Sequence, residues 1–290
     1  MKASIEDGDG WFPMAFIKKL PGNLLKYGVL LFTIVVSVFP ILWIIMGSFK
    51  TNGEIINGPF VLPSAINFNA YFYLFTQYNF LLYTFNSVVC SFIPTIISLI
   101  FFTMGAYAIA KYNFPGKYIF YTLFVITMLV PAYSRTQPIF SLVIGLNLYD
   151  TRAGLMLVYL SSGMAVSMFI LKATFQSIPL ELNEAATLDG ASFFQTFWLI
   201  DMPLAKNGLA TAGVLMFLSN WNEFYYANLL IATTSNRTLP VVTILFNSMF
   251  NYNYTNTFAA LTLVVIPGII FYSLAQKQVQ ASIISSAIKG

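Results

Sequence analysis

Residues Phe175 to Asn207 read FQSIPLELNEAATLDGASFFQTFWLIDMPLAKN, a polar stretch between long apolar runs. The stretch is too polar to cross a membrane, and its helix start and stop signals are too regular for a disordered segment. Pro179 fits the first turn of a helix, Ser177 can cap that helix, and Glu184 lies near its positive end. These signals predict a short helix that ends at Gly190.

A second short helix is predicted directly after this glycine. Ser192 and Gln195 have the spacing of a capping box, and Pro203 is expected to end the helix. Ala185 and Ala186 give the first helix a low profile, at which the backbone of another protein can approach closely. The stretch is therefore predicted to be a compact helix, turn, helix unit that contacts a partner.

The chain as a whole is too apolar for a soluble domain. Its 290 residues are 58% hydrophobic and 8% charged, with a mean hydropathy of +0.76, whereas soluble domains have about 25% charged residues. The chain must therefore lie mostly in lipid. The net charge is only +4 and the basic residues are dispersed without a basic stripe, which argues against nucleic-acid binding.

The residue inventory excludes several kinds of chemistry. With no His and a single cysteine, Cys90, the chain has no imidazole for nucleophilic catalysis or metal binding and no intrachain disulfide. Cys90 lies in an apolar run and is expected to be a small core residue. The sequence has no phosphate-binding loop of the G-x-x-x-x-G-K-S/T type, so it has no ATP site of its own. No catalytic residue, cofactor site or metal site is predicted.

Six uncharged runs are candidate membrane spans, because a bilayer core of about 30 Å needs roughly 20 residues of helix. The runs are Leu24 to Met46, Leu82 to Ala110, Tyr118 to Val130 with a continuation toward Ile144, Ala153 to Leu171, Gly208 to Thr233, and Thr257 to Ala275. In the third run Pro131 is expected to kink the helix. No internal repeat links them, which weighs against transporters built from two inverted halves. An all-α integral membrane protein with six transmembrane helices is therefore predicted.

The charged residues predict the orientation of these spans. With the N-terminus in the cytoplasm, 10 of the 14 Lys and Arg residues lie inside, and Lys50, Arg135, Arg152 and Arg237 lie outside. Positive residues favour the cytoplasmic side, so both termini and the unit at 175–207 are expected to be cytoplasmic. Each of the three outer arginines is either an anchor at the membrane interface or a contact for an extracellular protein.

Three regions follow from this layout. Residues 1–23 form a cytoplasmic or interfacial N-terminal segment, residues 24–275 form the six-span domain with the unit at 175–207, and residues 276–290 form a cytoplasmic tail. The N-terminal segment mixes aromatic residues with lysines, as do segments that lie along a membrane interface. The tail either frays or reaches a partner.

The fifth run contains Glu223, the only acidic residue well inside a predicted span. A charge in lipid is costly, so such a residue is a candidate functional site. At 100° per residue, a set of four polar or aromatic residues falls within an arc of about 160°. The set is Asn220, Trp221, Glu223 and Asn228. These groups suit sugar hydroxyls and ring faces, which predicts a translocation passage; the alternative is that they join helices away from any solute.

The spacing within the unit at 175–207 resembles a known family. The matching positions are Glu184, Ala185, Ala186, Gly190, Ile200 and Pro203. Their spacing is similar to the EAA loop of the membrane subunits of binding-protein-dependent ABC importers, and Met202 departs from it because leucine is usual there. In that family the loop forms a coupling helix that sits in a cleft of a cytoplasmic ATPase. The resemblance implies the coupling residues Glu184, Ala185, Ala186, Asp189, Gly190, Ile200 and Pro203.

Other segments resemble the carbohydrate-importing branch of this family, the maltose and glycerol-phosphate permease type. They are Asn86-Ser87, Ala106 to Lys117, Gly145 to Leu155, Trp221 to Phe224, Arg237 to Val241, and the terminal Ala287 to Gly290. The resemblance covers the chain from Leu24 onward. It implies a type I ABC importer permease fold and the uptake of a mono- or oligosaccharide.

The resemblance also implies a set of partners. They are a second, homologous permease in a heterodimer, two ATPase subunits, an extracellular solute-binding protein, a sugar substrate and membrane lipid. ATP and Mg²⁺ would be bound by the ATPase subunits, and the chain itself would bind no cofactor. The expected location is the bacterial cytoplasmic membrane.

Other functions remain as alternatives. An ABC permease for a non-sugar solute would share the EAA loop, since that loop occurs across importers. An ion-coupled secondary transporter would use Glu223 as its proton or sodium carrier and would work without an ATPase. A membrane-embedded enzyme is disfavoured because no acid, base or metal ligands cluster at one depth.

Overall fold

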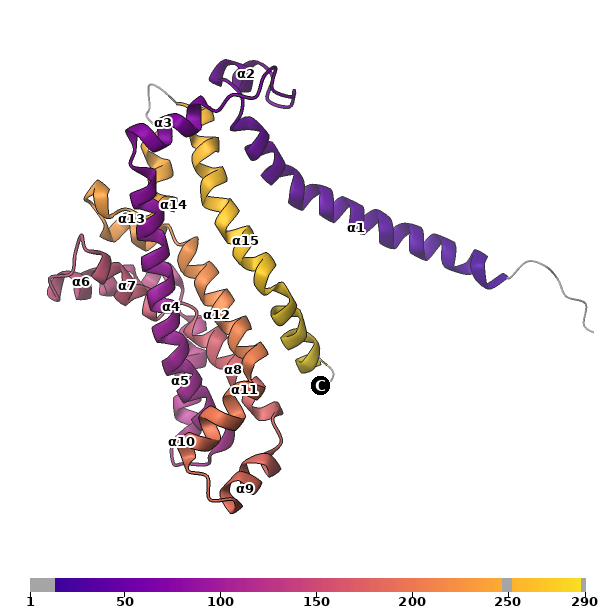
Figure 1. The fold of residues 1–290 in the computed structure, drawn as a ribbon, viewed down its shortest axis with the longest axis vertical. Helices are drawn as coiled ribbons and strands as arrows, with labels where there is room; N and C mark the ends of the chain where they lie inside the picture. The colour runs from indigo at the N-terminus through magenta and orange to yellow at the C-terminus, as the bar shows by residue number, and fades with distance from the viewer. Residues whose placement is uncertain (1–13, 247–251, 288–290) are drawn as a thin grey trace, which may run out of the picture.

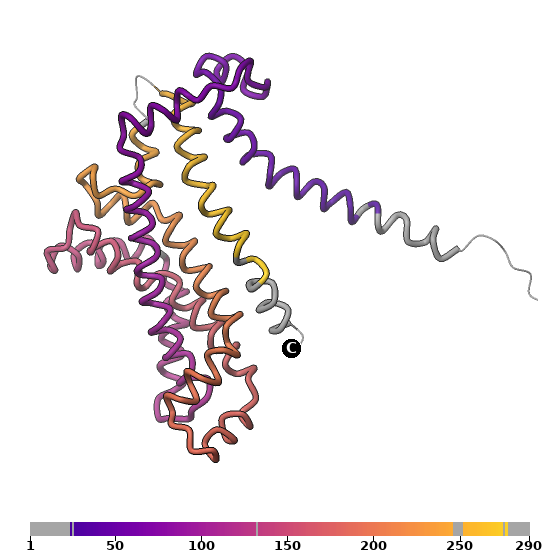
Figure 2. The backbone as a smooth tube through the Cα atoms, viewed as in Figure 1, coloured from indigo at the N-terminus to yellow at the C-terminus, as the bar shows by residue number. Residues whose placement is uncertain are grey.

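The computed structural model describes residues 14–246 and 252–287, and these residues form helices without a β-strand among them. Residues 1–13 of the predicted N-terminal segment and residues 288–290 of the predicted tail lie outside the described residues. Figures 1 and 2 show a helical bundle from which α1 (Met14–Gly47) diverges. The predicted all-α class is confirmed for the described part of the chain.

The other helices follow in chain order. In the first half of the chain they are α2 (Asn52–Asn57), α3 (Asn69–Gln77), α4 (Phe80–Lys111), α5 (Lys117–Leu129), η1 (Ala132–Arg135) and α6 (Thr136–Gly145). The next group is α7 (Arg152–Leu160), α8 (Met164–Ser177), α9 (Leu180–Leu188), α10 (Phe193–Gln195), η2 (Thr196–Asp201) and α11 (Met202–Leu204). The last group is α12 (Lys206–Trp221), α13 (Tyr225–Leu230), η3 (Thr234–Asn236), α14 (Leu239–Val242), η4 (Thr243–Phe246) and α15 (Tyr254–Ala287).

Three helical stretches in the described residues are long and apolar enough to cross a membrane. They are Lys26–Gly47, Phe80–Lys111 and Tyr254–Leu274, and they coincide with the first, second and sixth predicted runs. Two bent helix pairs raise the number to five if each pair is one span. The chain is therefore a multi-pass membrane protein.

The third predicted run is not one straight span. Its two helices, α5 and α6, are bent by 103° at a short break around Pro131. Proline has no amide hydrogen, and it forces Val130 before it into an extended conformation with φ −79° and ψ 115°. The kink expected at Pro131 is therefore confirmed, and the continuation toward Ile144 is a separate helix, α6, that turns away from the axis of α5.

The fourth and fifth predicted runs are also interrupted. The helices α7 and α8 are bent by 45°, and the turn between them contains Gly163 with a φ of +68°. In the fifth run α12 ends at Trp221 and α13 begins at Tyr225, so one helix from Gly208 to Thr233 is wrong. Each break leaves backbone groups that side chains have to satisfy.

The central helix α4 packs against α7, α8 and α12 through a face of small polar residues. Its buried hydroxyl residues are Ser87, Ser91, Thr95, Ser98 and Thr103. Small residues let helix backbones approach closely in lipid, and their hydroxyls bond to backbone carbonyls. The Ser98 hydroxyl donates to the Leu160 carbonyl at 2.6 Å and so joins α4 to α7.

The first helix, α1, diverges from the bundle and meets it at one end (Figure 1). There Gly47 lies against the ring of Phe258 on α15, and the rings of Trp43 and Phe258 are 5.0 Å apart. None of the most apolar window of Lys26–Gly47 is buried within the chain. This surface is therefore available to lipid or to another subunit.

The segment with α2 and α3 lies at the opposite end of the bundle from α9 (Figure 2). The helix α2 begins with a capping box, in which Thr51 and Glu54 bond to each other's backbone amides. The Glu54 carboxylate also accepts bonds from the hydroxyl and the amide of Ser64, the amide at 3.2 Å. The Ser64 hydroxyl and then the backbone amides lower the pKa of Glu54 to about 2.

Candidate functional site

The residues of the predicted coupling unit lie at one end of the bundle, on α9 and the turn that follows it (Figure 1). Glu184 and Ala185 are exposed, whereas Ala186 is buried against the rest of the chain. Asp189 is the C-cap residue of α9. Gly190 has a φ of +82°, a conformation that glycine adopts without a steric cost. The predicted helix and its stop at this glycine are confirmed.

The start of α9 differs from the prediction. Ser177 is the last residue of α8, and its hydroxyl donates to the Thr174 carbonyl at 2.8 Å. Pro179 is the N-cap residue of α9, in an extended conformation without a side-chain cap. The predicted cap by Ser177 is wrong because α8 continues six residues beyond the end of the apolar run at Leu171 and includes Ser177.

The second helix of the unit has the predicted start but not the predicted end. The Ser192 amide donates to the Gln195 side chain at 2.7 Å, and the Gln195 amide donates back to the Ser192 hydroxyl at 3.4 Å, which confirms the capping box. The chain then forms a π-helix at η2 and passes through Pro203 to Leu204. A π-turn leaves room for a residue that cannot donate an amide hydrogen, so Pro203 does not stop the helix.

Two further members of the coupling set lie on this helix. Ile200 is half-buried in the π-helix, and Pro203 is exposed in α11. The coupling residues thus divide between α9 and the helix that runs from Phe193 to Leu204. The exposed members are Glu184, Ala185, Asp189, Gly190 and Pro203.

A buried polar network holds the unit to the end of α4. The Lys111 ammonium lies 3.8 Å from one Asp201 carboxylate oxygen and donates to the Asn183 side chain and the Ile178 carbonyl, both at 2.8 Å. The other Asp201 oxygen accepts bonds from the Tyr107 hydroxyl at 2.9 Å and the Asn183 amide at 2.6 Å. The Lys111 and Asp201 side chains are only 5% and 0% exposed. We call Tyr107, Lys111, Asn183 and Asp201 the loop-anchoring network.

Sequence reasoning missed this network. The available signal was a lone carboxylate, Asp201, between apolar residues on both sides, together with Lys111 at the end of an apolar span. Buried charges are paired when they occur. The pairing itself joins residues 90 positions apart, which local spacing does not reveal.

Aromatic rings pack around the network, while apolar side chains point outward at the tip. The Tyr107 ring lies 4.8 Å from Phe197 and 5.2 Å from Phe175, measured between ring centroids. On the outside, Leu188 is 89% exposed and Leu199 is 72% exposed. A rigid support with exposed apolar residues and a nearby carboxylate is typical of a surface that binds another protein.

The second candidate region is the break between α12 and α13, where the predicted passage residues lie. Asn220 and Trp221 are each 2% exposed inside the bundle. The Asn220 amide donates to the Thr95 hydroxyl at 3.2 Å, and the Trp221 indole donates to the Val264 carbonyl at 3.0 Å. These two side chains therefore join α12 to α4 and to α15.

Glu223 lies in the non-helical break and not within a helix. Its carboxylate accepts bonds from the amides of Tyr226 at 2.8 Å and Ala227 at 3.0 Å, which begin α13. The Tyr159 hydroxyl donates to the same carboxylate at 2.7 Å. The glutamate thus has the hydrogen-bonding role of a helix cap, in addition to a charge at a half-buried position.

The four passage residues do not share one helix face. Their grouping at 100° per residue assumes one continuous helix, but α12 ends at Trp221. Asn228 is exposed on α13, and Glu223 lines a cavity that Asn220, Trp221 and Asn228 do not line. The expected common face is therefore wrong in its geometry, and a role in solute passage stays a prediction.

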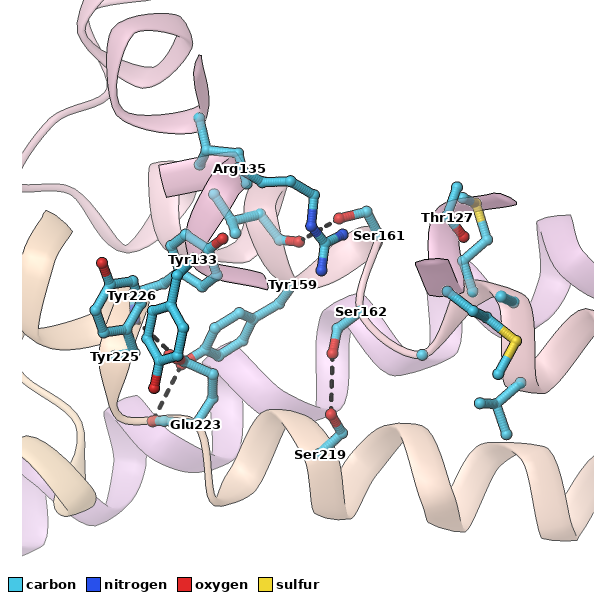
Figure 3. Close-up of a pocket in the computed structure, with 17 residues that line it drawn as sticks. Thr127, Tyr133, Arg135, Tyr159, Ser161, Ser162, Ser219, Glu223, Tyr225 and Tyr226 are labelled. Carbon is cyan, nitrogen blue, oxygen red and sulfur yellow. Dashed lines mark hydrogen bonds between the residues drawn. The ribbon is translucent and has the colours of Figure 1, made fainter. Parts of the chain in front are cut away.

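The cavity beside Glu223 has a volume of about 390 Å³ and lies between α5, the η1 to α6 turn, the α7 to α8 turn and the end of α12. Figure 3 shows the guanidinium of Arg135 and the rings of Tyr133 and Tyr225 with Tyr159 and Glu223. Hydroxyls of serines line another side, where the Ser162 and Ser219 hydroxyls are 3.1 Å apart. The helix breaks thus create a polar, aromatic cavity that periodicity alone does not predict.

Comparison with known families identifies the class of protein. Residues 102–285 match the family described as binding-protein-dependent transport system inner membrane component. The match includes the loop-anchoring network, the coupling unit and the Glu223 cavity.

Two curated relatives match nearly the whole chain. The trehalose transport system permease protein SugB of Mycobacterium tuberculosis is 33% identical over 268 residues, 91% of this chain and 97% of that protein. The diacetylchitobiose uptake system permease protein NgcG of Streptomyces coelicolor is 30% identical over 264 residues, 89% of this chain and 86% of that protein.

A solved structure shows the same fold. It is a chain of a bacterial ABC transporter involved in the import of the acidic polysaccharide alginate. It superposes with a TM-score of 0.78 and 27% sequence identity, covering 90% of this chain and 97% of that chain.

Proposed function

The chain belongs to the binding-protein-dependent transport system inner membrane component family, and we propose that it is the permease subunit of an ATP-driven importer for a mono- or oligosaccharide. The printed names of its relatives include permeases for trehalose and for diacetylchitobiose. The function is transport, and this subunit carries no hydrolytic step of its own.

The observation that supports this function most directly is the geometry of the coupling unit. Glu184 is exposed on α9, and the loop-anchoring network fixes that helix to the end of α4. A rigid, exposed helix at one end of a membrane bundle can transmit a movement of a bound subunit to the spans. We propose that α9 docks on an ATPase and that Glu184 forms a charge-assisted bond with a basic residue there.

The assembly we propose contains two permeases, two ATPase subunits and an extracellular solute-binding protein. The second permease is a homologous chain, and the exposed apolar surface of α1 is available to pack against it in lipid. ATP and Mg²⁺ are bound by the ATPase subunits, and this chain binds neither. Closure of the ATPases would turn the passage outward, and hydrolysis would turn it inward.

We propose six membrane crossings, with both termini in the cytoplasm of a bacterial cell. The crossings are α1, α4, α5, the α7 and α8 pair, α12 and α15. This arrangement puts α9 on the cytoplasmic side and the α2 to α3 segment on the outer side. The excess of Lys and Arg on the side of α9 supports this orientation.

In the passage, we propose different roles for the four residues predicted from the fifth run. Asn220 and Trp221 keep α12 packed against its neighbours, since both are buried and hydrogen-bonded inside the bundle. Glu223 lines the solute pathway at the cavity and at the same time begins α13. Asn228 is a surface position on α13 that faces another subunit or the solute.

The experiment that tests this function is purification of the tagged chain in mild detergent, with mass spectrometry of the proteins that accompany it. A second permease and an ATPase are expected. Their ATPase activity should rise when the solute-binding protein is added with one sugar. A chain that purifies without an ATPase would contradict the proposed function.

A further inference from the structure

We infer that the cavity at the bend between α5 and α6 is a subsite for a carboxylate-bearing sugar, with Arg135 as the residue that binds the carboxylate. The inference rests on the proposed function, because it assigns a substrate class to the solute passage of a permease. It goes further in naming an acidic sugar and one residue that selects it.

The first observation is a buried arginine nitrogen without a hydrogen-bond partner. The Arg135 Nε atom is buried and has no hydrogen-bond partner, while its side chain lines the cavity. Within the described residues the ion pair formed is between Lys111 and Asp201, at the far end of α4, so no carboxylate neutralises Arg135. A buried nitrogen of a cationic group without an acceptor is costly, which favours an anionic ligand there.

The carboxylate of Glu223 lines the same cavity, but both of its oxygens already accept hydrogen bonds from this chain. One of its oxygens accepts a bond from the Tyr226 amide, and the other accepts bonds from the Ala227 amide and the Tyr159 hydroxyl. Glu223 also makes no ion pair with Arg135. The Arg135 Nε donor in the cavity therefore has no acceptor among the described residues and is available to a ligand.

The chemistry of the guanidinium selects among anions. Nε and one terminal nitrogen of an arginine form a planar fork that matches the two oxygens of a carboxylate. Arg135 lies at the end of η1, directly before α6, where the bend of 103° directs the chain across the bundle. The bend thus brings the fork into the cavity, as Figure 3 shows.

The remaining lining fits the body of a sugar. The rings of Tyr133 and Tyr225 are 5.1 Å apart at 88°, and they form a corner of two aromatic faces. Aromatic faces suit the apolar side of a sugar ring, and the hydroxyls of Ser161 and Ser162 lie elsewhere on the wall. The volume of about 390 Å³ falls within the usual range for small-molecule sites, roughly 300–1,000 Å³.

The test uses the complex purified through a tag on this chain, in lipid nanodiscs, and equilibrium dialysis with two tritium-labelled probes. The probes are trimannuronate and β-1,4-linked mannotriose, which differ in whether the exocyclic carbon is a carboxylate or a hydroxymethyl group. The wild-type complex is expected to bind trimannuronate about tenfold or more tightly than mannotriose, as for a bond between two charged groups.

Three variants separate the binding of the carboxylate from a loss of structure. Arg135→Gln is expected to abolish the preference for trimannuronate while mannotriose binding stays within about twofold of wild type. Arg135→Lys keeps the charge but not the planar fork, so it should keep only part of the preference for trimannuronate. This variant also tests the inference if the complex with Arg135→Gln does not assemble. Lys117→Gln, at a lysine that bonds to Asn113 outside the cavity, is the control and should keep the full preference.

The inference is overturned if wild type binds the two probes equally, if it binds neither, or if the preference survives in Arg135→Gln. None of these results affects co-purification of an ATPase or its stimulation by a neutral sugar. The proposed function therefore stands or fails separately.

Discussion

The loop at 175–207 and the helix break at 222–224 each present a glutamate, but the two regions are built differently. Glu184 is exposed on a short helix whose start and stop are local signals, and its support lies beneath it in the loop-anchoring network. Glu223 is half-buried, and its carboxylate accepts hydrogen bonds from two amides at the start of α13 and from the Tyr159 hydroxyl. The first glutamate is free for a partner, whereas the second also has a structural task.

A carboxylate in an apolar run of a membrane protein can therefore have a functional role, a structural role or both. A carboxylate inside an apolar run looks functional because charge in lipid is costly. At a helix break the same carboxylate can accept hydrogen bonds from backbone amides that have no acceptor within the helix. Mutations therefore have to separate the charge of a residue from its hydrogen bonds.

The largest effect is expected from breaking the support of the loop. Asp201→Leu leaves the Lys111 ammonium buried without its carboxylate, and removal of one partner of a buried pair costs about 3–5 kcal/mol. We expect the thermal unfolding temperature of the purified complex to fall and uptake to be lost.

The matched control for this variant is the double change Asp201→Leu with Lys111→Met, which removes both charges. It should recover part of the lost stability, because the unpaired cation is gone. An Asp201→Leu complex as stable as wild type would show that the network does not support the loop.

The next effect concerns the exposed glutamate itself. Glu184→Lys reverses the charge on the face of α9 without touching the network, so membrane insertion and stability should be unchanged. Uptake per ATP hydrolysed should fall by about tenfold or more, since like charges at an interface cost several kcal/mol. Uptake and ATPase rates in proteoliposomes measure this ratio.

Glu181→Lys is the matched control, because Glu181 is also exposed on α9 and lies outside the coupling set. It should lower the ratio far less than Glu184→Lys. Equal effects of the two variants would mean that the total charge of α9 matters and that Glu184 has no specific contact.

A smaller effect is expected at the helix break. Glu223→Ala removes the acceptor for two amides at the start of α13 and should lower the free energy of unfolding by about 1 kcal/mol. Glu223→Gln keeps one acceptor oxygen but loses the charge. If the charge acts on the solute, the glutamine variant should reduce uptake as much as the alanine variant does, but with a smaller loss of stability, because its one oxygen still accepts a bond.

Uptake and thermal unfolding, measured on the same preparations, separate these two roles. A glutamine variant with wild-type uptake would leave Glu223 with a structural role alone. Failure of the complex to form in both variants would mean that helix packing, not solute passage, depends on this residue.

The smallest effect concerns Glu54, at the end of the molecule opposite α9. Its folded-state pKa is lowered to about 2 from an ordinary value of 4.5, chiefly by the Ser64 hydroxyl. The ionised carboxylate therefore stabilises the α2 segment above pH 4.5, and that contribution is lost as the pH falls from 4.5 toward 2. The protection of residues 51–64 against hydrogen exchange, relative to the intrinsic exchange rate at each pH, should fall over that interval.

Glu54→Gln tests the source of this pH dependence. A glutamine at this position does not ionise, so the change in protection of residues 51–64 below pH 4.5 should be absent. An unchanged pH profile in the glutamine variant would assign the transition to another group.

Local signals in the sequence were sufficient for part of this fold. The capping box at Ser192 and Gln195, the turn at Gly190 and three long apolar helices are all present where the residues predict them. Each depends on neighbours within a few positions, or on a length of about 20 residues set by the bilayer.

The parts that were missed depend on distant residues or on interruptions within apolar runs. Lys111 and Asp201 come into contact only when α4 and η2 pack together, and no local sequence pattern predicts that ion pair. The break at 222–224 contains no proline or glycine, so the hydropathy of the fifth run predicts one continuous helix across it. The predicted common face of Asn220 and Asn228 was wrong for the same reason, because it assumed one continuous helix.

The most direct test of the coupling assignment is photo-crosslinking in intact membranes from the tip of α9. A photoreactive phenylalanine analogue replaces Leu188, which is 89% exposed, and in a control it replaces Leu62, which is 70% exposed in the α2 to α3 segment. The coupling role predicts that the Leu188 position crosslinks to a protein with a phosphate-binding loop and that the Leu62 position does not. Crosslinks from Leu188 to lipid alone, or to no ATPase, would contradict it.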